Sequence, residues 1–183
     1  MTVCLLAICL VCSGLLAGVY ALTAEPIAAA AAAKNEAAIM EVLPETAVSI
    51  EEERTVEFEG ASYAYNLAYD EVGNVVGCAI NVAPVGFGGP IAIKVGFDVN
   101  GVIWNTKVLS QAETPGLGAK IVEKHFREQL EGKHIRNNAG EVVSVAVLKK
   151  GKKAEGQEQV DAISGATITC DGVHKMIATN LSE

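Results

Sequence analysis

Charged residues are missing from the start of this chain, and basic residues are scarce throughout it. The first charged residue is Glu25, and the 183 residues include 14 Lys and Arg against 22 Asp and Glu, for a net charge of −8. Because binding to nucleic-acid phosphates requires clustered Lys and Arg, this balance argues against a nucleic-acid partner. Beyond residue 22 there are only two cysteines, Cys78 and Cys170, and the three histidines are scattered. We therefore expect no metal site.

The uncharged N-terminal run is long enough to cross a membrane. Residues 3–22 carry no charge, and a helix of this length, at about 1.5 Å per residue, matches the roughly 30 Å hydrocarbon core of a bilayer. A cleaved signal peptide usually has a basic start and an apolar core of only about 7–15 residues. No Lys or Arg precedes this run, although a small-residue cleavage pattern at residues 19–21 keeps that alternative open. We expect a retained transmembrane anchor over residues 1–23.

An alanine-rich stretch follows the anchor, and its composition is that of a strong helix former. Thr23 is placed to cap a second helix with Pro26 in its first turn, and Pro44 would end that helix. We expect residues 24–50 to form this helix and a linker. Residues 51–183 then have the size and charge of one soluble domain.

Within the domain, a set of strands precedes the helices. Alternating and β-branched residues predict strands at 63–69, 75–82, 91–97 and 102–109, and turn sequences such as Asn100-Gly101 indicate hairpins. Helical periodicity follows over 117–130, then a strand at 142–148 and a helix from about Asp171 to Leu181. This order predicts an α+β fold, in which an N-terminal transmembrane helix precedes a mostly antiparallel sheet with flanking helices.

Three loops contain residues that suit close contact with a ligand. Residues 84–90 are rich in glycine but lack the Gly-Lys-Ser/Thr ending of a phosphate-binding P-loop. The segment Glu113–Gly118 contains two glycines that let a flat ligand approach the backbone, although the same composition suits a tight strand-to-helix connection. Residues 161–169 place small residues and hydroxyls before a helix, where backbone N–H groups suit a phosphate. Ser, Thr and Asp are also common helix caps, so both interpretations of this segment stay open.

Two of these loops together resemble the signatures of a known family. The run Asp161-x-x-Ser164-Gly165-Ala166-Thr167 matches the flavinylation motif of FMN-binding domains in Rnf and Na⁺-translocating NADH:quinone reductase complexes. The segment Glu113–Gly118 matches the second signature of the family. The single anchor, the alanine-rich helix before Pro44 and the Gly-Gly-Pro-Ile sequence before the third strand also fit, so the resemblance covers nearly the whole chain. The short length is most similar to the G subunit of Rnf, the ion-translocating ferredoxin:NAD⁺ oxidoreductase.

The resemblance implies a covalent FMN cofactor, joined through its phosphate to the hydroxyl of Thr167 by a separate flavin transferase that uses FAD as donor. On this basis the phosphate would be lined by Ser164, Gly165, Ala166 and Thr169. The isoalloxazine ring would lie against the segment Glu113–Gly118, with Leu117 on a ring face because the chain has few aromatic residues. Asp161 is assigned to recognition by the transferase, since a carboxylate repels a phosphate. The expected ring contacts are Glu113, Thr114, Gly116, Leu117 and Gly118.

The implied function is electron relay without a catalytic residue of the chain's own. The protein would be a single-pass protein of the cytoplasmic membrane, with its FMN domain on the outer side and other membrane subunits of an Rnf-type complex as partners. Two alternatives remain: a component of the NADH:quinone reductase type, and a non-redox, membrane-tethered binding domain. The residues leave open whether Cys78 pairs with Cys170 and whether Gly14 and Gly18 pack against a partner helix.

Overall fold

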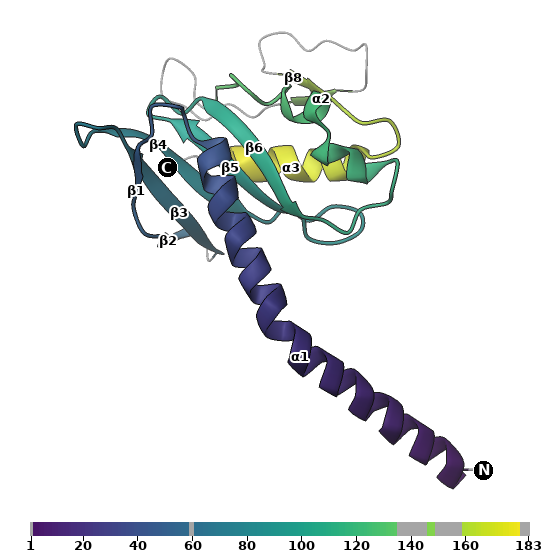
Figure 1. Cartoon of the computed structure of the whole chain (residues 1–183). Coiled ribbons are helices and arrows are strands. Elements are labelled where there is room, and N and C mark those ends of the chain that lie inside the picture. Colours follow the sequence, from purple (N-terminus) through teal and green to yellow (C-terminus); the bar gives the residue numbers. More distant parts are fainter. Residues whose placement is uncertain (1, 59–60, 135–145, 149–158, 180–183) are drawn as a thin grey trace. The chain divides into compact units, whose positions relative to one another are not determined.

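The computed structural model describes residues 2–58, 61–134, 146–148 and 159–179 (Figure 1). The chain divides into two compact units, Met1–Ala37 and Ala38–Glu183. The first unit consists of helix alone, and the second contains the sheet and the remaining helices. Of the strand expected over residues 142–148, residues 142–145 lie outside the described residues, and residues 146–148 form a strand as expected.

A single helix replaces the two that the sequence predicted at the N-terminus. Helix α1 runs over Thr2–Val42 and contains Pro26. Thr23 lies inside it, and its hydroxyl donates to the carbonyl of Val19 at 2.8 Å, so the expected helix start at Thr23 is wrong. The helix ends two residues before Pro44, as the restricted backbone before a proline predicts. Its apolar part has a mean hydropathy of 2.5 over 18 residues and is long enough to cross a membrane.

The predicted antiparallel sheet is confirmed, and it gains two strands that the pattern did not indicate. Neighbouring strands pair in the order β1-β3-β4-β5-β6, and β2 pairs with β3 beside β1. All of these pairs are antiparallel, whereas β7 (Ala146–Leu148) and β8 (Gln159–Asp161) form a separate parallel pair. The large sheet consists of β1 (Ser49–Ile50), β2 (Arg54–Phe58), β3 (Ala61–Tyr69), β4 (Val75–Val82), β5 (Ala92–Asp98) and β6 (Ile103–Ser110).

The helical segment that follows the sheet is interrupted. A 3₁₀ turn, η1, covers Gly118–Val122, and helix α2 covers Lys124–Arg127. Glu123 between them is extended, with φ −68° and ψ 142°, so the continuous helix predicted over 117–130 is wrong. Ile121 and Phe126 are both buried, and residues five apart lie on different faces of a straight helix. The break at Glu123 therefore lets both side chains enter the same core.

Two hydrophobic clusters lie on the two faces of the sheet. On one face, alternate residues of β5 pack with side chains of η1, α2 and α3 (Thr167–Thr179). On the other face, Ile39, Val42 and Leu43 at the end of α1 pack against the small side chains of β3 and β4. A Cβ atom at Gly96 would lie 1.8 Å from the Val42 carbonyl oxygen. Glycine at this position of β5 is therefore what allows the last turn of α1 to pack against the sheet.

Lys94 is buried in the middle of the sheet. It lies on β5, opposite Asn81 of β4 and Lys107 of β6, and its exposed fraction is 0%. Its Nζ atom has no hydrogen-bond partner within the described part of the chain. Burial lowers the pKa of Lys94, and the negative charge of Glu53 offsets only part of this effect.

Replacing Lys94 by methionine is expected to stabilise the domain. An unpaired polar group in the interior costs roughly 1–3 kcal/mol in mutational series, so Lys94→Met should raise the free energy of unfolding by about that amount at neutral pH. The matched control is Lys107→Met, because the Lys107 ammonium is paired with Glu41 at 2.6 Å and its removal offers no such gain. Urea unfolding of the full chain in detergent measures both variants, and equal or lower stability of Lys94→Met contradicts the expectation.

The same lysine should make stability depend on alkaline pH. Its folded-state pKa lies below the ordinary lysine value of 10.5, so between these two values the unfolded chain binds a proton that the folded chain has released. Stability therefore rises with pH across this window. Urea titrations between pH 7 and pH 10.5 should show this rise in the wild type and a smaller rise in Lys94→Met, whereas identical pH profiles would exclude Lys94 as its source.

Candidate functional site

The two signature loops, far apart in the sequence, meet around one cavity. Its volume is about 410 Å³, within the range of roughly 300–1,000 Å³ that is usual for ligand sites. The segment 113–118 forms one wall and the start of α3 forms another. None of the lining residues is Lys, Arg or His. They are Phe87, Glu113, Thr114, Leu117, Gly118, Gly165, Ala166, Thr167, Ile168 and Thr169.

Helix α3 begins at this cavity, at Thr167, four residues before the expected start at Asp171. The Cys170 N–H donates to the carbonyl of Ala166 at 3.1 Å, which makes Ala166 the residue at the cap position. Alanine has no side-chain oxygen to accept from the first amides of the helix, and Ser164 lies two residues too early. The amides of the first turn thus have no partner one turn earlier in the helix. Together with the helix dipole they favour an anion beside the exposed side chain of Thr167.

A buried carboxylate joins the three segments that surround the cavity. Glu113 is only 6% exposed. Its Oε1 atom accepts from the backbone N–H of Gly88 at 2.9 Å, and its Oε2 atom accepts from the hydroxyl of Thr169 at 2.8 Å. Glu113 therefore connects the glycine-rich segment 84–90, its own loop and the first turn of α3.

Two glycines make room for this carboxylate. A Cβ atom at Gly86 would lie 2.2 Å from Oε1 of Glu113, and one at Gly118 would lie 2.2 Å from Oε2. Both distances are far below van der Waals contact, so neither position can carry a side chain without displacing Glu113. The glycine-rich segment 84–90, which is not a P-loop, thus has a structural role in the site.

A further glycine lets the two signatures touch. Gly165 has a φ of +80°, a conformation that L side chains rarely adopt. A Cβ atom there would lie 3.2 Å from Cδ2 of Leu117. Leu117 is 42% exposed and lines the cavity, the position that the resemblance implied for a contact with a ring face.

Three expected site residues lie elsewhere or are already engaged. Gly116 shapes the turn with a φ of +77° but does not line the cavity, and Ser164 lines a different cavity together with Asp161. The hydroxyl of Thr169 donates to Oε2 of Glu113, which gives Thr169 a positioning role, and its expected contact with a phosphate stays a prediction.

Two lining residues were missed from the sequence. Phe87 is 73% exposed and Ile168 is 62% exposed, so each presents a large apolar side chain at the cavity. The sequence feature that could have indicated Phe87 as a lining residue is its position as an aromatic side chain between two glycines in a loop. Ile168 directly follows the motif, and the hydroxyl side chains of Thr167 and Thr169 on either side of it favoured an interpretation based on polar contacts.

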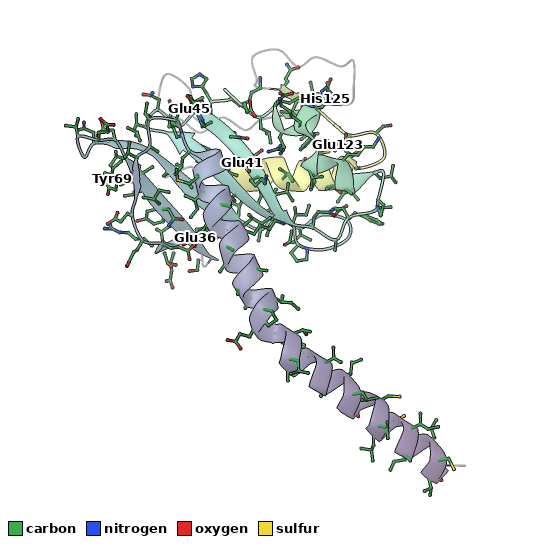
Figure 2. All side chains as sticks on the ribbon, in the orientation of Figure 1. Glu36, Glu41, Glu45, Tyr69, Glu123 and His125 are labelled. Carbon is green, nitrogen blue, oxygen red and sulfur yellow. The ribbon has the colours of Figure 1, made fainter. Side chains whose placement is uncertain are left out.

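A second cavity separates the carboxylate of the motif from Thr167. It measures about 330 Å³, and Asp161 lines this cavity and not the one beside Thr167. The backbone N–H of Asp161 donates to Oε1 of Gln129 at 2.8 Å, which fixes the start of the motif. Figure 2 shows Glu123 and His125 on the α2 side of this region. The residues that line this cavity with Asp161 are Lys120, Glu123, His125, Phe126, Gln129, Ala162, Ile163 and Ser164.

The two cysteines of the domain are free thiols. Burial raises the pKa of Cys78 to about 11, and it also raises the pKa of Cys170. The Cys170 sulfur accepts the N–H of Ile163 at 3.4 Å, so it supports the loop of the motif. Within the described residues, no three His, Cys, Asp or Glu side chains are grouped to hold a metal ion.

Comparison with known proteins agrees with this geometry. The model of the FMN-binding domain family matches residues 86–182, and that of the RnfG N-terminal region matches residues 2–42. The G subunit of the ion-translocating oxidoreductase complex of Haemophilus influenzae strain PittEE is 33% identical over 172 residues, which cover 88% of this chain and 78% of that protein. The chain belongs to the RnfG family.

Other relatives are similar over shorter stretches. The G subunit of the Na⁺-translocating ferredoxin:NAD⁺ oxidoreductase complex of Acetobacterium woodii is 33% identical over 102 residues, and the match spans 55% of this chain and 45% of that protein. Among solved structures, NqrC, the C subunit of the Na⁺-translocating NADH-quinone reductase, from Parabacteroides distasonis has a TM-score of 0.61 at 32% identity, covering 72% of this chain and 74% of that one. The fold is thus shared between this RnfG chain and NqrC. With its apolar N-terminal helix, the chain is a single-pass, membrane-associated protein.

Removing the Thr169 hydroxyl, which donates a hydrogen bond to Glu113, should destabilise the domain. Thr169→Val keeps the side-chain shape but leaves Oε2 of the buried Glu113 without this donor, and an unsatisfied buried group costs about 1–3 kcal/mol. The control Thr167→Val changes an exposed residue of the same helix turn and should leave the unfolding free energy within about 0.5 kcal/mol. Urea unfolding of the flavin-free full chains compares the two, and equal effects would show that the Thr169–Glu113 bond contributes nothing.

Proposed function

We propose that this chain, as an electron-transfer component of an Rnf-type membrane complex, relays electrons through an FMN bound by a phosphoester to Oγ1 of Thr167. The observation that supports this most directly is the convergence of both signature loops on one cavity at the start of α3. Within that cavity Thr167 is the exposed hydroxyl in the first turn of α3. FMN, when bound, supplies the redox chemistry, and the chain supplies position and environment.

Each wall of the cavity has a role in this proposal. The amides at the start of α3 hold the phosphate, whose negative charge the helix dipole favours. Phe87 and Leu117 offer apolar surface to the isoalloxazine, and Thr114 lies at the same wall with a polar side chain. Glu113 is buried and each of its oxygens accepts a hydrogen bond from a neighbouring segment. We therefore assign it to positioning the other residues that line the cavity.

A covalent link accounts for the lack of basic residues around the cavity. Reversible binding of a phosphate favours Lys or Arg in charge-assisted hydrogen bonds, yet the lining residues include neither. A phosphoester retains the cofactor without them and leaves one negative charge for the helix amides to offset. The same link prevents the cofactor from diffusing away between electron transfers.

Attachment requires a flavin transferase with FAD as donor. The oxygen of the Thr167 hydroxyl forms a bond to the FMN phosphorus, the bond from that phosphorus to the bridging oxygen of AMP breaks, and AMP leaves with the hydroxyl proton released. Thr167 is exposed, as an acceptor for an external enzyme must be. Asp161, six residues before Thr167 in the same loop, is recognised by the transferase.

Residues 3–22 anchor the chain in the cytoplasmic membrane, with the FMN domain on the outer side and other membrane subunits of the complex as partners. A second candidate, a component of the NADH:quinone reductase type, is favoured by the fold similarity to NqrC of that enzyme. Co-purification distinguishes the two, because an Rnf-type assembly brings iron–sulfur proteins and ferredoxin-dependent activity.

Substituting Thr167 should abolish the covalent flavin. Natively expressed wild-type chain is expected to give a fluorescent band after denaturing electrophoresis, and Thr167→Ala is expected to give none because the acceptor oxygen is gone. Thr55→Ala, at an exposed position on β2, serves as the control and should keep the wild-type fluorescence. A non-fluorescent wild-type band in the presence of an active transferase would favour the non-redox binding domain.

A further inference from the structure

We propose that the flavin transferase recognises a composite surface, the α2 groove, in addition to the linear motif. The α2 groove is the second cavity, and its polar lining consists of Lys120, Glu123, His125, Gln129, Asp161 and Ser164. This inference rests on the proposed function, since it concerns how the same Thr167 receives its cofactor.

The motif is divided between two cavities that lie at opposite ends of one short loop. Gly165, Ala166 and Thr167 line the first cavity, between the segment 113–118 and the start of α3, which we call the flavin cavity. Asp161 and Ser164 line the α2 groove. A cofactor in the first cavity therefore does not need the first half of the motif. A molecule that contacts the side chains of Asp161 and Ser164 must occupy the α2 groove. It then also contacts side chains of η1 and α2 that line the same groove.

Three ionisable side chains of the α2 groove have no structural role within the described part of the chain. No hydrogen bond or ion pair to a described residue is formed by the side chains of Asp161, Glu123 or His125, and all three are exposed. Nearby carboxylates differ: Glu128 pairs with Lys124 at 3.3 Å, and Glu41 pairs with Lys107. The α2 groove is thus lined by the carboxylates of Asp161 and Glu123, which form no ion pair with a described residue.

The backbone of the groove is nevertheless fixed. Oε1 of Gln129, just after α2, accepts the backbone N–H of Asp161 at 2.8 Å, and the carbonyl of Leu148 on β7 accepts the N–H of Ala162 at 2.8 Å. Phe126 on the floor of the groove is buried in the core. The backbone that carries the carboxylates of Asp161 and Glu123 is therefore held by hydrogen bonds, which lowers the entropic cost of binding a partner.

The occupant that this chemistry fits is the transferase and not the cofactor. The carboxylates of Asp161 and Glu123 outnumber the one ammonium in the lining, that of Lys120, so the groove repels the phosphate of FMN and attracts a Lys or Arg side chain of a protein. The transferase must also reach the exposed Thr167 six residues beyond Asp161, so contact with the groove holds the enzyme beside its acceptor. An electron-transfer partner would instead approach the apolar rim that Phe87 and Ile168 form at the flavin cavity.

The test measures how fast the full chain in detergent accepts flavin from FAD with purified transferase. The variants Glu123→Gln and His125→Gln remove one groove side chain each, outside the linear motif. Glu128→Gln is the matched control, because Glu128 belongs to the same segment but does not line the groove. In-gel flavin fluorescence against time and chain concentration gives kcat and KM of the transferase for each chain.

We expect each groove variant to lower kcat/KM by about fivefold or more, mainly through a higher KM, since residues at recognition surfaces often contribute more than about 1 kcal/mol. The control should stay within twofold of the wild type. After prolonged incubation all chains should reach full loading, with the same flavin absorbance and the same thermal unfolding midpoint.

Two results would overturn the inference while leaving the proposed function intact. One is a wild-type loading rate in both groove variants. The other is normal loading followed by slower reduction of the flavin in the assembled complex, which would assign the groove to the electron-transfer partner. If the wild-type chain itself accepts no flavin, the proposed function fails and this inference fails with it.

Discussion

The carboxylate of Glu113 is the constraint on which the functional region depends. It is buried, and it accepts hydrogen bonds from Gly88 and Thr169, which belong to segments that lie 25 and 56 residues away in the sequence. A buried carboxylate is costly unless its oxygens are satisfied, so these two donors and Glu113 hold each other in place. The start of α3, with Thr167 two residues before Thr169, is positioned by that bond.

The sheet supplies the rigid frame around this interaction. Glu113 follows the end of β6, the segment 84–90 connects β4 to β5, and α3 packs on the same face through Cys170 and Val173. Glycines at 86 and 118 leave the space that the carboxylate fills. The cavity is thus formed by loops at one end of a sheet, a common place for functional residues because loops vary while the frame stays constant.

Local patterns predicted the parts of the molecule that local forces determine. Alternation over residues 63–69 and 75–82 and the turn at Asn100-Gly101 led to the correct antiparallel hairpins, and residues of the two motifs line one cavity. Packing between distant segments decided the rest. The break at Glu123 exists because Ile121 and Phe126 share one core, the burial of Glu113 depends on a glycine segment 25 residues earlier, and the division of the motif into two cavities requires α2 to lie beside Asp161. No periodicity within a single segment contains this information.

The most direct test of the account is a crystal structure of the flavinylated chain. We predict continuous electron density from Oγ1 of Thr167 to the phosphate, the phosphate at the amides of the first turn of α3, and the isoalloxazine against Leu117 and Phe87. The hydrogen bonds of Glu113 to Gly88 and Thr169 should be retained. Density that joins the flavin to another residue, or a ring that lies in the α2 groove beside Asp161, would contradict it.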